Sequence, residues 1–163
     1  MDPTFAGKVV FATGAASGLG KSTALAFARA GAALSLMDTD TAGLADRRAQ
    51  VEELGSACLA QTADVSHKAN CTAAIAATVQ RFGHLDVLCN VAGAVAFYHA
   101  AEITEEQWQR SLGVNLSGPF YLSQAAIPHL LRTAGNIVNV ASVNGMRGSA
   151  HVVPYATAKA GLI

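Results

Sequence analysis

The stretch KVVFATGAASGLG (residues 8–20) decides the fold of this chain. Its first six residues are a short apolar run with β-branched side chains, which predicts a buried strand. Three glycines follow at once (Gly14, Gly18 and Gly20), and a helix is predicted from Gly18 to Arg29. Its apolar residues recur at helical spacing: Leu19, Thr23, Ala26, Phe27 and Ala30. A glycine loop between a first strand and a first helix is typical of a turn that receives a pyrophosphate.

Apolar runs and helical stretches alternate along the rest of the chain. Strands are predicted within 33–38, 57–65, 85–93 and 136–142, and helices within 41–54, 66–82, 104–132 and from residue 155. A β-α-β-α order predicts a doubly wound parallel sheet in a three-layer α/β/α sandwich. The strands are almost continuously apolar, as expected where helices cover both faces of a sheet. No linker or repeat divides the chain, so residues 1–163 are expected to form a single domain.

Residues at the helix ends refine these boundaries. Gly83 is a natural stop, and Ser66 is expected to cap the helix before it. Thr104 and Gln107 form a capping box at the start of the long helix, in which two prolines (119 and 128) predict kinks. In the helix at 41–54 the charged side chains are expected on the outer face: Asp46, Arg47, Arg48, Glu52 and Glu53.

The composition narrows the class of protein. The chain is 52% hydrophobic and 13% charged, with a formal net charge of zero. A neutral chain without a basic cluster argues against nucleic-acid and anionic-membrane partners, and no apolar run approaches the roughly 20 residues that span a bilayer. The cysteines Cys58, Cys71 and Cys89 lack CxxC spacing, so reduced thiols in a cytoplasmic protein are expected and no metal site is predicted. A catalytic cysteine is the weaker alternative.

Asp38 is placed to choose the cofactor. A carboxylate at the end of the second strand can accept hydrogen bonds from the adenine-side ribose of a dinucleotide, and it repels a 2′-phosphate. Ser17 and Thr39, beside the expected phosphate site, are uncharged. NAD is therefore favoured over NADP. The alternative role for Asp38 is capping of the helix that begins after Asp40.

Four polar residues are placed to act on a substrate. Open α/β sheets bind ligands at the carboxyl ends of their strands, where Ser142 closes the fifth strand. Tyr155 and Lys159 follow one helical turn apart, on the same helix face, and Asn115 lies in the long helix. Each residue alone has an ordinary structural explanation, such as a strand-end cap or a solvated lysine. Their combination with the glycine loop favours a catalytic site.

Together the motifs resemble the short-chain dehydrogenase/reductase family. They are TGAASGLG (13–20), Asp64–Val65, NVAG (90–93), Asn115, Ser142 and YATAK (155–159), in the family's order and approximate spacing. The resemblance implies a Rossmann-type fold and a cofactor site made by Gly14, Ser17, Gly18, Leu19, Gly20, Asp38, Asp64, Val65, Asn90, Ala92, Gly93, Tyr155 and Lys159. Val91 stands where the family often has a second Asn, so one side-chain hydrogen bond is lost and a small packing adjustment is expected.

The residue types indicate the chemistry. Oxidation of an alcohol needs a base for the O–H proton, and a phenol serves at neutral pH only if a nearby ammonium favours its phenolate. Tyr155 is therefore the expected base, or acid in the reverse direction, and Ser142 orients the substrate oxygen. The resemblance implies that Lys159 also binds the nicotinamide ribose and that Asn115 supports a water-linked proton path to Lys159. We expect hydride transfer between NAD and a secondary alcohol or ketone; the alternative is a dinucleotide-binding module without turnover.

The substrate and assembly are expected from the remaining features. Apolar residues around the site favour a substrate with an apolar body; they are Ala94, Val95, Val143, Met146, Val152 and Val153, with His99, beside Phe97 and Tyr98, as a wall residue and Arg147 in a solvated loop. The family's fold continues with two further strands, which this chain lacks. A longer polypeptide, or an unseen packing partner, is therefore expected. The resemblance also implies a homo-oligomer, a dimer or tetramer, formed through the helix at 104–132 and the Tyr–Lys helix.

Overall fold

A parallel sheet organises the computed structural model, which describes residues 4–163. The strand order is β3-β2-β1-β4-β5. The strands are β1 (Val9–Thr13), β2 (Ala33–Asp38), β3 (Cys58–Thr62), β4 (Val87–Asn90) and β5 (Asn136–Asn139). The chain winds outward from β1 in both directions, and every pairing is parallel. The predicted doubly wound α/β fold is confirmed.

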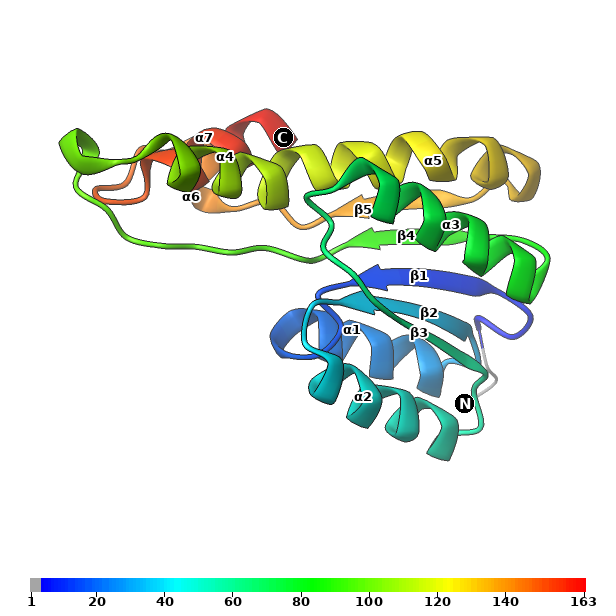
Figure 1. The fold of residues 1–163 in the computed structure, drawn as a ribbon. Helices are drawn as coiled ribbons and strands as arrows, with labels where there is room; N and C mark the ends of the chain where they lie inside the picture. Colours follow the sequence, from blue (N-terminus) through cyan, green and yellow to red (C-terminus); the bar gives the residue numbers. More distant parts are fainter. Residues whose placement is uncertain (1–3) are drawn as a thin grey trace.

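Helices cover both faces of this sheet, as Figure 1 shows. α1 (Gly18–Arg29) and α2 (Thr41–Glu53) lie on one face, and α3 (Lys68–Phe82) and α5 (Gly118–Thr133) on the other. The other helical elements are η1 (Ala100–Glu102), α4 (Glu105–Leu112), η2 (Gly113–Ser117), α6 (Val143–Met146) and α7 (Val153–Leu162). α4, α6 and α7 gather beyond the carboxyl ends of the strands (Figure 1).

The core is divided between the two faces of the sheet. Phe11 and Leu88 belong to the cluster under α3 and α5, whereas Val10 and Leu36 belong to the cluster on the other face. All five residues of β1 are buried. A strand covered on both sides needs apolar side chains at every position, which is why β1 reads as a continuous apolar run.

The buried face of α1 differs from the predicted one. The buried residues are Gly20, Ala24 and Ala28, and Leu19 is 67% exposed. Small side chains let this helix approach the sheet closely, so size decides its inner face more than hydrophobicity does. Leu19 is left beside the cavity described below.

The predicted helix ends are partly confirmed. Gly83 ends α3 in the left-handed conformation (φ 85°), and both halves of the Thr104–Gln107 capping box are present. Ser66 does not cap α3: His67 occupies the N-cap position, without a side-chain bond. Ser66 lies in the turn before the helix, where its amide donates to Asp64 Oδ1.

The long helix predicted over 104–132 is interrupted by a π-helical segment. η2 separates α4 from α5, and Pro119 lies in the first turn of α5. Gly113 and Gly118 flank the interruption where the helix meets the loop after β3. A Cβ on Gly118 would lie 2.9 Å from Val65 O, and one on Gly113 would lie 3.0 Å from Ser66 Cβ. This close packing on the loop accompanies the change of helical pitch, which turns Asn115 inward.

Arg47 corrects another prediction. It was expected on the outer face of α2, but only 4% of it is exposed. Its guanidinium donates to Ala16 O and to Gln50 Oε1. Its neighbour Arg48 does face outward and pairs with Glu52 at 2.8 Å. A charged residue on a helix predicts an exposed side chain, so the sequence did not indicate that Arg47 packs against the glycine loop.

The edge of the sheet at β5 is open. In the described part of the chain, β5 pairs only with β4, and Val138 is 48% exposed. Within residues 4–163, no helix has both the length and the apolar character that crossing a membrane requires.

Candidate active site

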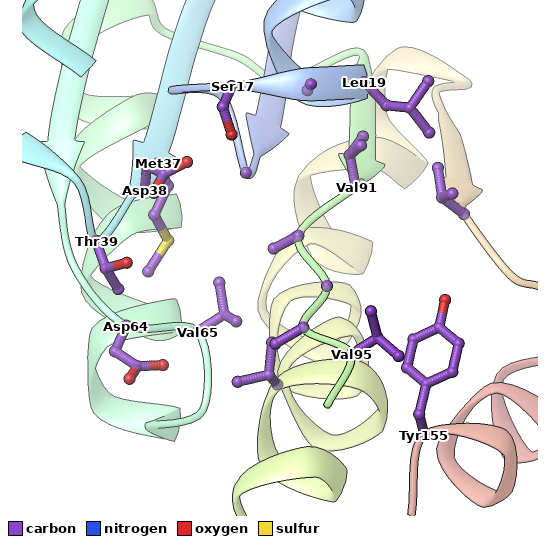
Figure 2. Close-up of a pocket in the computed structure, with 18 of the residues that line it drawn as sticks. Ser17, Leu19, Met37, Asp38, Thr39, Asp64, Val65, Val91, Val95 and Tyr155 are labelled. Carbon is purple, nitrogen blue, oxygen red and sulfur yellow. The ribbon is translucent and has the colours of Figure 1, made fainter. Parts of the chain in front are cut away.

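A cavity of about 420 Å³ lies at the carboxyl ends of the strands. Figure 2 shows Asp38, Thr39 and Asp64 on one side of it and Tyr155 on the other, with Val91 and Val95 between them. Most of the residues predicted to bind the cofactor line this cavity. They are Gly14, Ser17, Gly18, Leu19, Gly20, Asp38, Asp64, Val65, Ala92, Gly93, Tyr155 and Lys159. The fold thus gathers motifs that are far apart in sequence.

The glycine loop is packed so closely at Gly14 and Gly20 that these two positions have no room for a side chain. A Cβ on Gly20 would lie 2.0 Å from Gly14 O, and one on Gly14 would lie 2.9 Å from Ala92 Cα. Gly14 also has a φ of 66°, in the region that favours glycine. Thr13 fixes the neighbouring loop, because its Oγ1 accepts from the amides of Val91 and Ala92 at 3.0 Å. Sequence reasoning missed Thr13, although its place at the end of β1 was visible.

Asp38 lies at the cavity as predicted, with both of its oxygens already used. Oδ2 accepts from the Ala16 amide at 2.9 Å, and Oδ1 accepts from the Asp40 amide at 3.0 Å. The residue that caps α2 is Asp40, whose Oδ1 accepts from the Gly43 amide. The alternative role of Asp38 as the cap is therefore wrong. A carboxylate has about four acceptor positions, so Asp38 can still receive a ribose hydroxyl.

Asp64 forms an ion pair that sequence reasoning did not identify. Its Oδ2 accepts from Arg110 Nη1 on α4, and Arg110 also lines the cavity. Partial burial of Asp64 opposes its ionisation, but the hydrogen bonds from Arg110 and Ser66 outweigh that effect and lower its pKa to about 2. Nothing in the sequence indicated this ion pair, because Arg110 and Asp64 lie 46 residues apart and only the fold brings them together.

We expect Arg110→Ala to raise the pKa of Asp64 towards that of an ordinary aspartate. The folded-state pKa is below the unfolded value of about 3.9, so this ion pair stabilises the fold fully above that value and less as the pH falls towards 2. The variant removes this contribution. An NMR titration of the Asp64 carboxyl carbon measures the change, with Arg132→Ala on α5 as the control. An unchanged Asp64 titration in Arg110→Ala would contradict the assignment.

Lys159 is the buried cation of the site. Only 3% of it is exposed, and its Nζ donates to Val140 O at 2.6 Å. Nζ lies 5.8 Å from the centre of the half-buried Tyr155 ring. Burial lowers the pKa of Lys159. Gly145 helps to place it, because α6 packs on α7 so closely that a Cβ there would lie 2.6 Å from the Lys159 carbonyl carbon.

We expect Lys159→Met to stabilise the fold at neutral pH. Because the folded-state pKa of Lys159 is lowered, its ammonium costs stability below that pKa, and the cost fades as the pH rises through it towards the unfolded value of about 10.4. Val140 lines the cavity, so water can replace the lost donor. The expected result is a higher Tm at pH 7 for Lys159→Met than for wild type.

Calorimetry at pH 7 and pH 10 tests this expectation. The difference in Tm between wild type and Lys159→Met should narrow between pH 7 and pH 10, because the cost of burying the ammonium fades as the pH rises through the lowered pKa of Lys159. The control is Lys21→Met, at a partly exposed position on α1. A variant that is less stable than wild type at pH 7 would show that the Lys159–Val140 bond outweighs the cost of burial.

Asn115 is fully buried in η2 and joins this helix to the loop after β4. Its Nδ2 donates to Ala94 O at 2.8 Å and its Oδ1 accepts from the Ala94 amide at 3.1 Å. A Cβ on Gly93 would lie 3.2 Å from Asn115 Oδ1 and 3.8 Å from Lys159 Nζ. Asn115 Oδ1 and Lys159 Nζ therefore both lie close to Gly93. The structure brings Asn115 to the site without placing it in the cavity lining.

Two further predicted residues lie outside the cavity lining. Ser142 is the N-cap of α6, and its Oγ accepts from the Asn144 amide at 3.2 Å. Asn90 is buried and donates to Asn139 Oδ1 at 2.8 Å, so it ties β4 to β5, while its own Oδ1 has no partner within the described residues. Of the apolar residues expected around the substrate, Ala94 and Val95 line the cavity. Val152 is buried, whereas Val143, Met146 and Val153 are exposed.

The three cysteines are buried and free. Burial raises the pKa of Cys58 to about 12 and those of Cys71 and Cys89 to about 11. A thiol that stays protonated at neutral pH is a poor nucleophile. The geometry therefore favours the predicted structural role over a catalytic one.

Comparison with known proteins gives consistent matches. The model of the short chain dehydrogenase family matches residues 8–163. The dehydrogenase subunit BbsD of Thauera aromatica, which acts on (2S)-[(R)-hydroxy(phenyl)methyl]succinyl-CoA, is 38% identical over 160 residues. That match covers 96% of this chain and 63% of the relative.

Two solved structures with bound NAD have the same fold. Carveol dehydrogenase from Mycobacterium avium in complex with NAD is 28% identical, with a TM-score of 0.93, over 98% of this chain and 63% of that one. An NAD⁺-bound xylitol dehydrogenase is 31% identical, with a TM-score of 0.92, over 97% and 62%. The chain thus spans less than two thirds of the length of these relatives.

Proposed function

Because this chain belongs to the short-chain dehydrogenase family, we propose that it takes part in hydride transfer between NAD and a secondary alcohol or ketone. The observation that carries the proposal is the pairing of Tyr155 with buried Lys159 at one end of the glycine-loop cavity. NAD, when bound, supplies the hydride acceptor. The residues of this chain hold the cofactor, orient the substrate and move the proton.

The cofactor fits the residues that line the cavity. The amino terminus of α1 presents unpaired backbone amides and the positive end of its dipole, which favour a pyrophosphate. The close contact between Gly20 and Gly14, which only glycine permits, brings the start of α1 against the loop. Asp38 and Asp64 would hold the adenosine half, and Lys159 the nicotinamide ribose.

Tyr155 would act as the base in alcohol oxidation and as the acid in ketone reduction. The Lys159 ammonium, 5.8 Å from the centre of the Tyr155 ring, would stabilise negative charge that develops on the Tyr155 oxygen during proton transfer. Ser142 would orient the substrate oxygen, for which its Oγ must turn away from the Asn144 amide. Asn115 would support proton exchange beside Lys159.

NAD rather than NADP is the proposed cofactor. The support is Asp38, whose carboxylate would repel a 2′-phosphate, together with the NAD bound in two structural relatives. Parallel fluorescence titrations with NADH and NADPH test the choice, and tighter binding of NADPH would reverse it.

The assembly and location are also proposals. Phe120, Ile127 and Leu131 are exposed apolar residues on α5, which supports a homo-oligomer formed through this helix. Light scattering on wild type and Leu131→Asp tests this proposal: the variant should form a smaller assembly, with a lower molar mass in solution. The buried, free cysteines support a reducing compartment such as the cytoplasm.

The direct test of the reaction is NADH formation with a panel of secondary alcohols that differ in the size of their apolar part. NAD-dependent turnover that depends on Tyr155 supports an enzyme. Binding of NADH without turnover by the full-length protein across the panel would support a dinucleotide-binding module instead.

A further inference from the structure

We propose that Arg47 is a positioning residue for the phosphates of the cofactor, a role that rests on the proposed dinucleotide site. Arg47 lies on α2, outside the cavity lining, and is 4% exposed. Its Nη2 donates to Ala16 O at 3.3 Å, and its Nη1 donates to Gln50 Oε1. The guanidinium therefore contacts the glycine loop from within the protein.

The charge of Arg47 has no compensating anion within the part of the chain that the structure describes. None of the ion pairs among residues 4–163 involves Arg47, and its Nε is buried without a hydrogen-bond partner. A buried and unpaired cation costs free energy, and such costs are typical of functional sites. The pyrophosphate expected on the glycine loop would supply the missing negative charge.

One peptide group connects Arg47 with the cavity. The Ala16 carbonyl, which accepts from Arg47, and the Ser17 amide belong to the same peptide group. A charged donor on the carbonyl polarises that group and makes the amide a stronger donor. Ser17 is the N-cap of α1 and lines the cavity, where its amide can face a phosphate oxygen.

Asp38 fixes the preceding peptide of the same loop. The Ala16 amide donates to Asp38 Oδ2 at 2.9 Å, so side chains of opposite charge hold the two polar groups of Ala16. Gly43 on α2 packs closely against the same residue, since a Cβ on Gly43 would lie 3.0 Å from Ala16 Cβ. These contacts of Arg47, Asp38 and Gly43 with Ala16 lie at the glycine loop and do not involve Tyr155. Loss of the Arg47 contact should therefore weaken cofactor binding and leave proton transfer intact.

The test compares Arg47→Met with Arg48→Met, the same change at the exposed neighbour. Fluorescence titration gives the Kd for NADH, steady-state kinetics give kcat and the KM for NAD, and calorimetry gives Tm. Arg47→Met should raise the Kd and the KM roughly 10-fold, the lower end of the effect of losing a hydrogen bond from a charged group. Its kcat should stay within about twofold of wild type, and Arg48→Met should resemble wild type in all three values.

A conservative variant separates positioning from simple packing. Arg47→Lys keeps a charged donor near Ala16 O and should recover most of the affinity for NADH. If Arg47→Met does not fold, Arg47→Gln is measured by the same criteria. A folded, neutral variant that binds NADH as tightly as wild type overturns the role of Arg47, whatever its Tm. Failure of wild type itself to bind NADH overturns the proposed function instead.

Discussion

Tyr155→Phe is expected to lower kcat by roughly 10²–10⁴-fold, the usual contribution of a positioned acid–base group. The substitution removes only the phenolic oxygen, so the ring keeps its place in the first turn of α7, with the Lys159 ammonium 5.8 Å from its centre. The cavity keeps its shape and the contacts of the glycine loop. The affinity for NADH should therefore stay within about threefold of wild type.

The assay measures NADH formation at saturating NAD and the Kd for NADH in the same preparation. Tyr98→Phe is the control, because Tyr98 contributes its backbone amide, at 2.7 Å from His151 O, to the adjoining loop. It should retain wild-type kcat. If Tyr155→Phe turns over normally, another group is the base. If both turnover and NADH binding are lost, the prediction that Tyr155 acts in proton transfer without affecting cofactor binding is wrong.

Gly20→Ala is expected to have the largest effect on the fold. Its Cβ would lie 2.0 Å from Gly14 O and 2.5 Å from Gly14 C, and both atoms belong to the backbone. No flexible side chain can move aside, so the loop must separate from α1. The expected cost is about 3 kcal/mol or more, which corresponds to a fall in Tm of roughly 6–12 °C.

Two other glycines provide graded controls for Gly20→Ala. Gly18 has open space around its Cβ position but a φ of 52°, so Gly18→Ala should cost only about 1–2 kcal/mol. Gly148 has open space and no positive φ, so Gly148→Ala should leave Tm unchanged. Calorimetry and NADH titration measure all three. Similar Tm values for Gly20→Ala and Gly148→Ala would show that the close contact at the loop is relieved at little cost.

The local signals in the sequence predicted most of the fold. The glycine loop, the apolar strands and the Thr104–Gln107 capping box each depend on residues close together in the chain, and the structure confirms each of them. Ser66 does not cap α3, because the helix begins one residue later than predicted and His67 takes the N-cap position. The break at η2 was missed because it accompanies packing of Gly113 and Gly118 on a loop that is distant in sequence.

The sequence alone determined the α/β order, the glycine loop and the identity of the candidate residues, because periodicity, glycine spacing and capping are local properties. Only the tertiary structure decided which side chains meet. It paired Arg110 with Asp64, turned Asn115 inward beside Gly93, and buried Arg47 against Ala16. A charged residue on a helix gives the same local signal whether it faces water or a loop. The burial of its charge depends on segments that the fold alone brings into contact.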